Sequence, residues 1–208
     1  MSIDNNYYQY IIRRFKLWAR FYDWTWVLIN YLRPQLINFS GRPTREQILD
    51  VCTGTGAVAL GLAKLNNSVS AIDLSPEMIE IARKKDSAKQ INWQVQNSTQ
   101  LKFPTASFDL ITISFGLHEM PVALAQATLT QCARLLKPGG KIVVMDFHRG
   151  QSLLFKIGCP FLKLYECRYY PKFIAVDFSQ IAVAAGLSIT RQQKTLFDLA
   201  ALWELQIK

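Results

Sequence analysis

The sequence has few of the residues that build metal sites or disulfide scaffolds. Its cysteines and histidines are Cys52, Cys132, Cys159, Cys167, His118 and His148. They form no Cys-x-x-Cys pair and no zinc-ligand spacing, so we predict no metal site. The longest uncharged apolar run, Trp24 to Leu32, is shorter than the roughly 20 residues that span a bilayer. With no basic-then-apolar signal peptide at the N-terminus, these absences predict a cytoplasmic protein.

The charge balance is the unusual bulk property of the chain. The net charge is +9, from 24 lysines and arginines against 15 acidic residues. Such a charge is compatible with nucleic acid, an anionic membrane surface or an acidic substrate. Basic residues alternate with aromatic ones in two segments, Tyr7 to Arg33 and Phe155 to Phe173.

Residues Gln47 to Ala63 join a short apolar strand to a helix through two glycines. Asp50 lies near the end of the strand, and Gly54 and Gly56 allow a positive φ and close approach of the backbone to a ligand. The free N–H groups of the following helix favour a ligand with a carboxylate or phosphate. The spacing also fits a dinucleotide fingerprint, with Asp73 near the distance of a ribose-binding acid. Taken alone, the glycines leave a nicotinamide dinucleotide, another cofactor or a simple turn open.

Strand and helix patterns alternate through most of the chain. The expected strands are residues 48–52, 68–73, 91–96, 108–114, 141–147, 187–193 and 195–208. We expect a doubly wound, mostly parallel, seven-stranded Rossmann-like α/β sheet, because strands separated by helices pair in parallel. The last two strands predict a C-terminal antiparallel hairpin with its turn at Gln193-Lys194.

The N-terminal segment from Tyr8 to Leu32 has apolar residues at helical spacing. Its basic residues, which include Arg13, Arg14 and Lys16, fall mostly on the opposite side, and Pro34 is expected to end the helix. An amphipathic basic helix of this kind can cap the domain or lie on an anionic membrane. The second alternative would place the protein at the inner face of a membrane.

Four successive motifs resemble those of class I S-adenosylmethionine-dependent methyltransferases. The motifs are Leu49–Gly56, Asp73–Met78, Phe108–Thr112 and Leu135–Gly140. Their joint occurrence in this order over about residues 45–150 is specific where the glycines alone are not. Within the class, Tyr22-Asp23, Thr112–Leu117 and Leu196–Lys208 are most similar to the ubiquinone/menaquinone-biosynthesis C-methyltransferases.

Some residues depart from the pattern of this family. Cys52 stands where the class usually has its first glycine, Ala57 replaces an acid, and Asn97-Ser98 replaces the usual Asp-Ala pair at the adenine. On the substrate side, His118 stands where the quinone enzymes commonly carry arginine. The segment from Phe147 to Leu187 is also shorter than theirs.

The resemblance implies S-adenosylmethionine as the cofactor and assigns residues to it. The implied cofactor-binding residues are Tyr22, Asp50, Thr53, Gly54, Thr55, Gly56, Asp73, Leu74, Asn97, Ser98, Thr99 and Ser114. Of these, Tyr22 would lie over the methionine end, the glycine loop would hold the amino acid part, Asp73 the ribose and residues 97–99 the adenine. The implied substrate pocket contains Phe115, His118, Tyr169 and Tyr170.

The chain would then form a single domain, residues 1–208. We expect a helical cap at 1–43, a cofactor-binding core at 44–150, and a substrate-lid segment with a C-terminal helix and hairpin at 151–208. Methyl transfer is an in-line displacement, so alignment and exclusion of water can supply most of the catalysis. His118 is the candidate base because histidine titrates near neutral pH, and the alternative is that it only shapes the pocket. His148 is a weaker candidate.

The favoured substrate is a lipophilic quinone or phenol, because aromatic and basic segments flank the core. A phospholipid amine, a small polar metabolite and a non-catalytic cofactor-binding protein remain alternatives. Nucleic acid is disfavoured, since Ser114-Phe115-Gly116-Leu117 replaces the Asn/Asp-Pro-Pro-aromatic motif of enzymes that methylate base amino groups. Neither the accepting atom (carbon, oxygen or nitrogen) nor the oligomeric state is indicated by the sequence.

Overall fold

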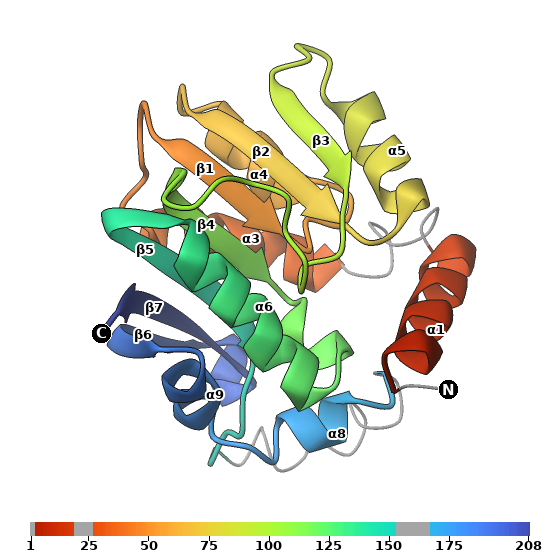
Figure 1. Ribbon diagram of the computed structural model, residues 1–208, viewed down its shortest axis with the longest axis vertical. Helices are drawn as coiled ribbons and strands as arrows, with labels where there is room; N and C mark the ends of the chain where they lie inside the picture. Colours follow the sequence, from red (N-terminus) through yellow and green to blue (C-terminus); the bar gives the residue numbers. More distant parts are fainter. Residues whose placement is uncertain (1–2, 19–26, 153–166) are drawn as a thin grey trace.

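A seven-stranded sheet forms the centre of the computed structural model, which describes residues 3–18, 27–152 and 167–208 (Figure 1). The strands are β1 (Gln47–Val51), β2 (Ser68–Asp73), β3 (Ile91–Val95), β4 (Phe108–Ser114), β5 (Leu136–Phe147), β6 (Leu187–Thr195) and β7 (Ala200–Ile207). Their order is β3-β2-β1-β4-β5-β7-β6, with β1 to β5 parallel and β7 antiparallel to both β5 and β6. The fold predicted from the sequence is confirmed, including the C-terminal hairpin.

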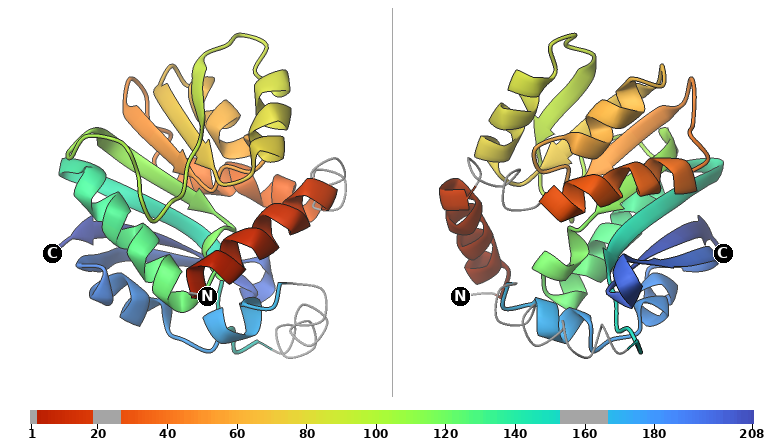
Figure 2. Two further views of the ribbon diagram at one scale, coloured as in Figure 1. Left: turned by 45° about the vertical axis from the view of Figure 1, so that its right-hand side comes forward. Right: turned by 180° about the vertical axis from the view of Figure 1, so that it is seen from behind.

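Helices cover both faces of the sheet. The helices α3 (Val27–Phe39) and α4 (Ala57–Ala63) lie on one face, and α6 (Val122–Leu135) and α9 (Phe178–Ala184) lie on the other (Figures 1 and 2). Helix α5 (Pro76–Lys85) packs against β2 and β3, and the short α8 (Tyr170–Phe173) packs against the 3-10 turn η1 (Leu117–Glu119). Helix α1 (Ile3–Trp18) lies beyond the carboxyl ends of the parallel strands (Figure 1). None of the described helices is long and apolar enough to cross a membrane.

The central strands are apolar on both faces because helices cover each side of the sheet. Ile48, Leu49, Leu110, Ile111 and Val143 are fully buried. Burying an aliphatic side chain of this size stabilises the fold by about 1.5–3 kcal/mol relative to leaving it exposed. These strands are therefore the most strongly fixed part of the molecule, and they determine where the loops at their carboxyl ends lie.

The strand order reverses direction at β1, which places a crevice at the carboxyl ends of β1 and β4. Val51 at the end of β1 is in register with Ile72 of β2 and Ile113 of β4. In open parallel sheets, ligands bind at such a reversal. The register therefore brings the loops that follow β1, β2 and β4 to a single site.

Pro34 does not end the N-terminal helix as the sequence predicted. It lies inside α3, which continues to Phe39. Leu32, Leu36 and Phe39 on this helix are buried. Burial of these side chains on the sheet outweighs the hydrogen bond that proline cannot make, because packing supplies most of the stability of a helix in a protein.

The turn of the C-terminal hairpin lies further along the chain than Gln193-Lys194. Strand β6 continues to Thr195, and the reversal uses the 3-10 turn η2 (Leu196–Asp198). Leu196 and Asp198 adopt positive φ values of 50° and 74°. The polar residues that suggested a turn are instead exposed positions of an edge strand, where charged side chains are common because they discourage pairing with another chain.

Candidate active site

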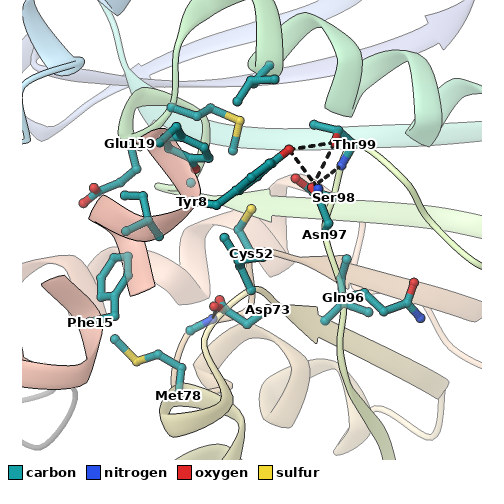
Figure 3. Close-up of a pocket in the computed structure, with 18 of the residues that line it drawn as sticks. Tyr8, Phe15, Cys52, Asp73, Met78, Gln96, Asn97, Ser98, Thr99 and Glu119 are labelled. Carbon is teal, nitrogen blue, oxygen red and sulfur yellow. Dashed lines mark hydrogen bonds between the residues drawn. The ribbon is translucent and has the colours of Figure 1, made fainter. Parts of the chain in front are cut away.

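A pocket opens at the carboxyl ends of the strands and is roofed by α1 (Figure 3). Its described lining residues are Tyr7, Tyr8, Ile11, Phe15, Cys52, Gly54, Ile72, Asp73, Leu74, Met78, Gln96, Asn97, Ser98, Thr99, Phe115, Gly116, Glu119, Met120 and Leu124. The cavity volume is about 60 Å³, which holds a few water molecules. The loops after β1, β2, β3 and β4 thus meet at one site, and four side chains of α1 (Tyr7, Tyr8, Ile11 and Phe15) line it from above.

The loop after β1 has a left-handed backbone at Cys52, Gly54 and Gly56, with φ values of 56°, 55° and 84°. The conformation at Cys52 explains why a glycine is usual at this position, since a side chain there costs roughly 1–2 kcal/mol. The Gly56 N–H donates to the Thr53 carbonyl (3.0 Å) and closes the turn before α4. The backbone of Gly54 lines the pocket, whereas Thr53, Thr55 and Gly56 support the loop from outside it.

Asp50 supports this loop from below and does not line the pocket. Its carboxylate is buried and accepts hydrogen bonds from the hydroxyls of Thr53 (2.6 Å) and Thr112 (2.7 Å). These bonds tie the loop to β4. Burial raises the pKa of Asp50 to about 6, although both hydroxyls act in the opposite direction.

The raised pKa of Asp50 predicts a pH-dependent stability. The folded value of about 6 lies above the unfolded value of 3.8, so the native state binds the proton more tightly. This contribution is complete below the unfolded pKa and is lost as the pH rises through the folded pKa. We expect the free energy of unfolding to fall by about 3 kcal/mol between about pH 4 and pH 6. Urea denaturation of wild type and Asp50→Asn at several pH values measures the effect, and parallel profiles for the two proteins would contradict it.

Asp73 lies at the end of β2 and faces the pocket. Its two carboxylate oxygens accept hydrogen bonds from the N–H groups of Gly54 (2.8 Å) and Ser75 (2.9 Å). Burial raises the pKa of Asp73, while these N–H groups favour the charged form. Leu74 follows it in the pocket wall. Asp73 therefore joins the glycine loop to the start of α5 and presents a negative charge between them.

The loop after β3 is held by Tyr8 of α1. The Asn97 amide donates to the Tyr8 hydroxyl (2.8 Å), which also lies 3.2 Å from the Thr99 hydroxyl oxygen. The Asn97 carbonyl oxygen accepts hydrogen bonds from the backbone N–H and the hydroxyl of Thr99 (3.0 and 2.9 Å). Figure 3 shows Tyr8 reaching across the pocket to this loop. Ser98 bonds to Thr128 of α6 (2.9 Å between the hydroxyl oxygens), which fixes the loop from the other side.

The loop after β4 forms the opposite wall of the pocket. Phe115, with a φ of 52°, and Gly116 line it, and a Cβ added at Gly116 would stand 2.5 Å from the Cβ of Cys52. The backbone of Gly116 thus packs directly on the side chain of Cys52. The Ser114 hydroxyl is buried below this wall and has no hydrogen-bond partner in the described part of the chain.

His118 is buried behind the pocket wall and does not line the pocket. Its Nδ1 lies 2.6 Å from a carboxylate oxygen of Asp146 at the end of β5. The rings of Phe115, Phe147 and Tyr170 pack edge-to-face around the imidazole. Glu119, the next residue, does line the pocket.

The remaining predicted residues lie elsewhere. Tyr169 packs edge-to-face on Tyr7 of α1, with ring centroids 5.6 Å apart. His148 lines a separate groove between β5, α9 and β7, beside Trp203, and its Nε2 is 3.2 Å from a carboxylate oxygen of Asp198. Tyr22 lies outside the described residues, as do residues 153–166 of the predicted substrate-lid segment. No cluster of metal-ligating side chains occurs among the residues that the structure describes.

The sequence analysis missed several residues at this site. Tyr7 and Tyr8 lie on the apolar side of the N-terminal helix, where side chains of the core are indistinguishable from those of a pocket. Asp146 is an acid at the end of a strand, as Asp50 and Asp73 are, and that position was a usable signal. Glu119 had only its place beside His118 to indicate it.

The chain is similar in sequence and in fold to known methyltransferases. A family model described as a methyltransferase domain matches residues 48–140. A demethylmenaquinone methyltransferase from Tropheryma whipplei is 34% identical over 171 residues, which cover 79% of this chain and 69% of that protein. A ubiquinone/menaquinone biosynthesis C-methyltransferase from Geotalea daltonii is 41% identical over 117 residues, which cover 53% and 49%. The crystal structure of an S-adenosylmethionine-dependent methyltransferase from Aquifex aeolicus superposes with a TM-score of 0.66 at 19% identity, covering 85% of this chain and 89% of that one.

Proposed function

The chain belongs to the S-adenosylmethionine-dependent methyltransferases, and from this premise we propose that it methylates a lipophilic acceptor of the quinol or phenol type. The names of the two curated relatives, which concern demethylmenaquinone and ubiquinone/menaquinone biosynthesis, support this acceptor class. Of these two relatives, the Tropheryma protein matches the longer part of this chain, 171 residues against 117.

The residues of the pocket fit the cofactor. A carboxylate with two backbone N–H partners at the end of β2, next to a left-handed glycine loop, suits a ribose beside an amino acid group. Asp73 would hold the ribose, the loop at Gly54 the methionine part, and Asn97 to Thr99 the adenine. The Ser114 hydroxyl, which is buried and unpaired among the described residues, would lie on the methyl-donor side. When bound, the cofactor supplies a methyl group on a positively charged sulfur.

The walls of the pocket suit an apolar acceptor. Phe15, Phe115, Met120 and Leu124 contribute aromatic and aliphatic surface to the pocket. Pockets of this kind hold a flat, apolar molecule by burial and orient it with a few polar groups. The protein's task in such a transfer is to align the acceptor with the methyl group and to exclude water.

Membrane delivery of the acceptor is the second part of the proposal. On α1, Arg13 and Lys16 are exposed, and the exposed Arg168 lies over the ring of Tyr10 at 4.4 Å. Arg13 and Lys16 stand on the helix that roofs the pocket, and Arg168 packs against that helix from the segment before α8. Together with the net charge of +9, they favour an anionic membrane surface, from which a lipophilic acceptor can enter.

One labelling experiment tests both parts. The protein is incubated with methyl-labelled S-adenosylmethionine and a demethylmenaquinol in phosphatidylglycerol or phosphatidylcholine vesicles, beside phosphatidylethanolamine vesicles and a water-soluble catechol. We expect label in the quinol, with a higher rate in the anionic vesicles at low salt. Label confined to phosphatidylethanolamine or to the catechol would overturn the acceptor class. Equal rates in both quinol vesicles would overturn membrane delivery.

A further inference from the structure

The pocket contains a carboxylate that cofactor binding does not use. Among the described lining residues, the carboxylates are Asp73 and Glu119. Both oxygens of Asp73 already accept backbone hydrogen bonds at the cofactor side. Glu119 belongs to the opposite wall, after β4, and Figure 3 shows its side chain directed toward α1. It therefore lies on the acceptor side of the pocket.

Behind Glu119 stands a histidine with a fixed orientation. The Nε2 of His118 lies 3.9 Å from a carboxylate oxygen of Glu119, within the range of an ion pair. The Nδ1 on the other side of the ring lies 2.6 Å from Asp146. This contact to a carboxylate favours the tautomer with the proton on Nδ1, which leaves Nε2 toward Glu119 as a proton acceptor.

Asp146 is itself held rigidly. Its carboxylate is fully buried and accepts hydrogen bonds from the backbone N–H groups of Leu117 (2.9 Å), His118 (3.3 Å) and Phe147 (2.7 Å). These donors stabilise its negative charge inside the protein. Asp146 thus fixes both the ring of His118 and the turn η1 that carries Glu119.

We propose that Glu119 is the base that removes the proton from the methyl acceptor, and that Asp146 and His118 position and support it. This inference rests on the proposed function. The acceptor's electron pair forms the new bond to the methyl carbon, and the pair of the broken carbon–sulfur bond stays on sulfur. The acceptor's proton goes to the Glu119 carboxylate and from there to Nε2 of His118. The base is thereby assigned one residue after the histidine that the sequence suggested, because aromatic rings enclose His118 and Glu119 faces the pocket.

Several charged or titratable groups face Glu119. Arg14 of α1 lies 3.8 Å from it, Tyr7 approaches from the same helix, and Cys167 approaches from the segment before α8; His118 and Asp146 stand behind it. Burial raises the pKa of Tyr7 and raises that of Cys167 to about 11, and the charge of Glu119 adds to both effects. Arg14 favours the charged form of Glu119, so the lid helix and the base are electrostatically linked.

Kinetics with the demethylmenaquinol test the assignment. We expect Glu119→Gln to lower kcat by roughly 10²- to 10⁴-fold, the usual effect of a general base, while the cofactor dissociation constant stays within about twofold. Glu80→Gln, on the exposed face of α5, is the matched control and should keep wild-type kcat. Arg14→Gln should move the acidic limb of the kcat profile to higher pH, because loss of the cation raises the pKa of Glu119. Wild-type kcat in Glu119→Gln would overturn the proposal.

A second measurement does not depend on the acceptor. The chain has two histidines, so ¹⁵N-imidazole spectra contain two ring systems, and His148→Asn assigns them. We expect His118 in the Nδ1-protonated tautomer, an altered His118 titration in Glu119→Gln, and an unaltered His148. If the His118 titration is the same in wild type and Glu119→Gln, the proposed proton transfer from Glu119 to His118 is wrong. If the quinol is not methylated but His118 responds to Glu119, the acceptor class is wrong and the coupling of Glu119 to His118 stands. If Glu119→Gln methylates the quinol at the full rate, the assignment of Glu119 as the base is wrong and the acceptor class stands.

Discussion

Replacing Asp73 by alanine should weaken S-adenosylmethionine binding by at least tenfold. The substitution removes the charged acceptor that we assign to the ribose hydroxyls, and a hydrogen bond to a charged group is worth about 1.5–3 kcal/mol. It also leaves the N–H groups of Gly54 and Ser75 without their present partner, so the glycine loop loses its tie to β2. Isothermal titration calorimetry of the variant measures the loss.

Asp109→Ala is the matched control for this variant. Asp109 also accepts a backbone hydrogen bond, from the N–H of Gln47 (2.9 Å), and pairs with Lys137, but it lies at the amino end of β4. We expect the control to bind the cofactor with wild-type affinity. Unchanged affinity in Asp73→Ala, or an equal loss in both variants, would contradict the assignment of Asp73 to the ribose.

Replacing Gly56 by alanine should destabilise the fold by about 2–5 kcal/mol. The residue has a φ of 84°, which costs a side chain roughly 1–2 kcal/mol. The added Cβ would also stand 2.5 Å from a ring carbon of Trp93 and 3.0 Å from the Cβ of Ala82, and overpacking of this kind costs roughly 1–3 kcal/mol. Chemical denaturation gives the change in the free energy of unfolding.

Gly41→Ala separates the two causes. Gly41 has nearly the same φ, 86°, and no atom within 4 Å of an added Cβ. It should therefore show the backbone cost alone, about 1–2 kcal/mol. Equal losses at the two positions would mean that Trp93 moves aside without cost, and the close packing of α5, β3 and the glycine loop would then not limit this turn.

The parts of the structure that the sequence predicts are those that depend on local patterns. Apolar runs and strand-end residues such as Asp73 and Ser75 identify the sheet and its ligand edge, because burial and capping act within a few residues. Pro34 was misread for the opposite reason, since the buried Leu36 that keeps α3 helical contacts distant parts of the chain. The role of Tyr8 was missed for the same reason, because its partners Asn97 and Thr99 lie about 90 residues away in the sequence.

The assignment of the base also depends partly on local sequence and partly on distant contacts. The sequence identifies the loop after β4 as the place of the chemistry, and His118 is the natural candidate there by residue type. Which of His118 and Glu119 reaches the pocket depends on the packing of Phe147 and Tyr170 around the imidazole. That packing is set by β5 and by α8, and no local pattern contains it.

The position of Tyr8 affects the apparent dissociation constant of the cofactor. The adenine that we assign to Asn97 and Thr99 needs the polar groups that Tyr8 already contacts, so the adenine and the Tyr8 hydroxyl compete for them. If binding selects molecules in which α1 has moved, the measured dissociation constant equals the intrinsic one divided by the open fraction. An open fraction of roughly 1% would weaken the apparent affinity about 100-fold. In that case, any surface that draws α1 away from the pocket, such as an anionic membrane, would raise the apparent affinity for the cofactor. The contacts between the cofactor and the protein would stay the same.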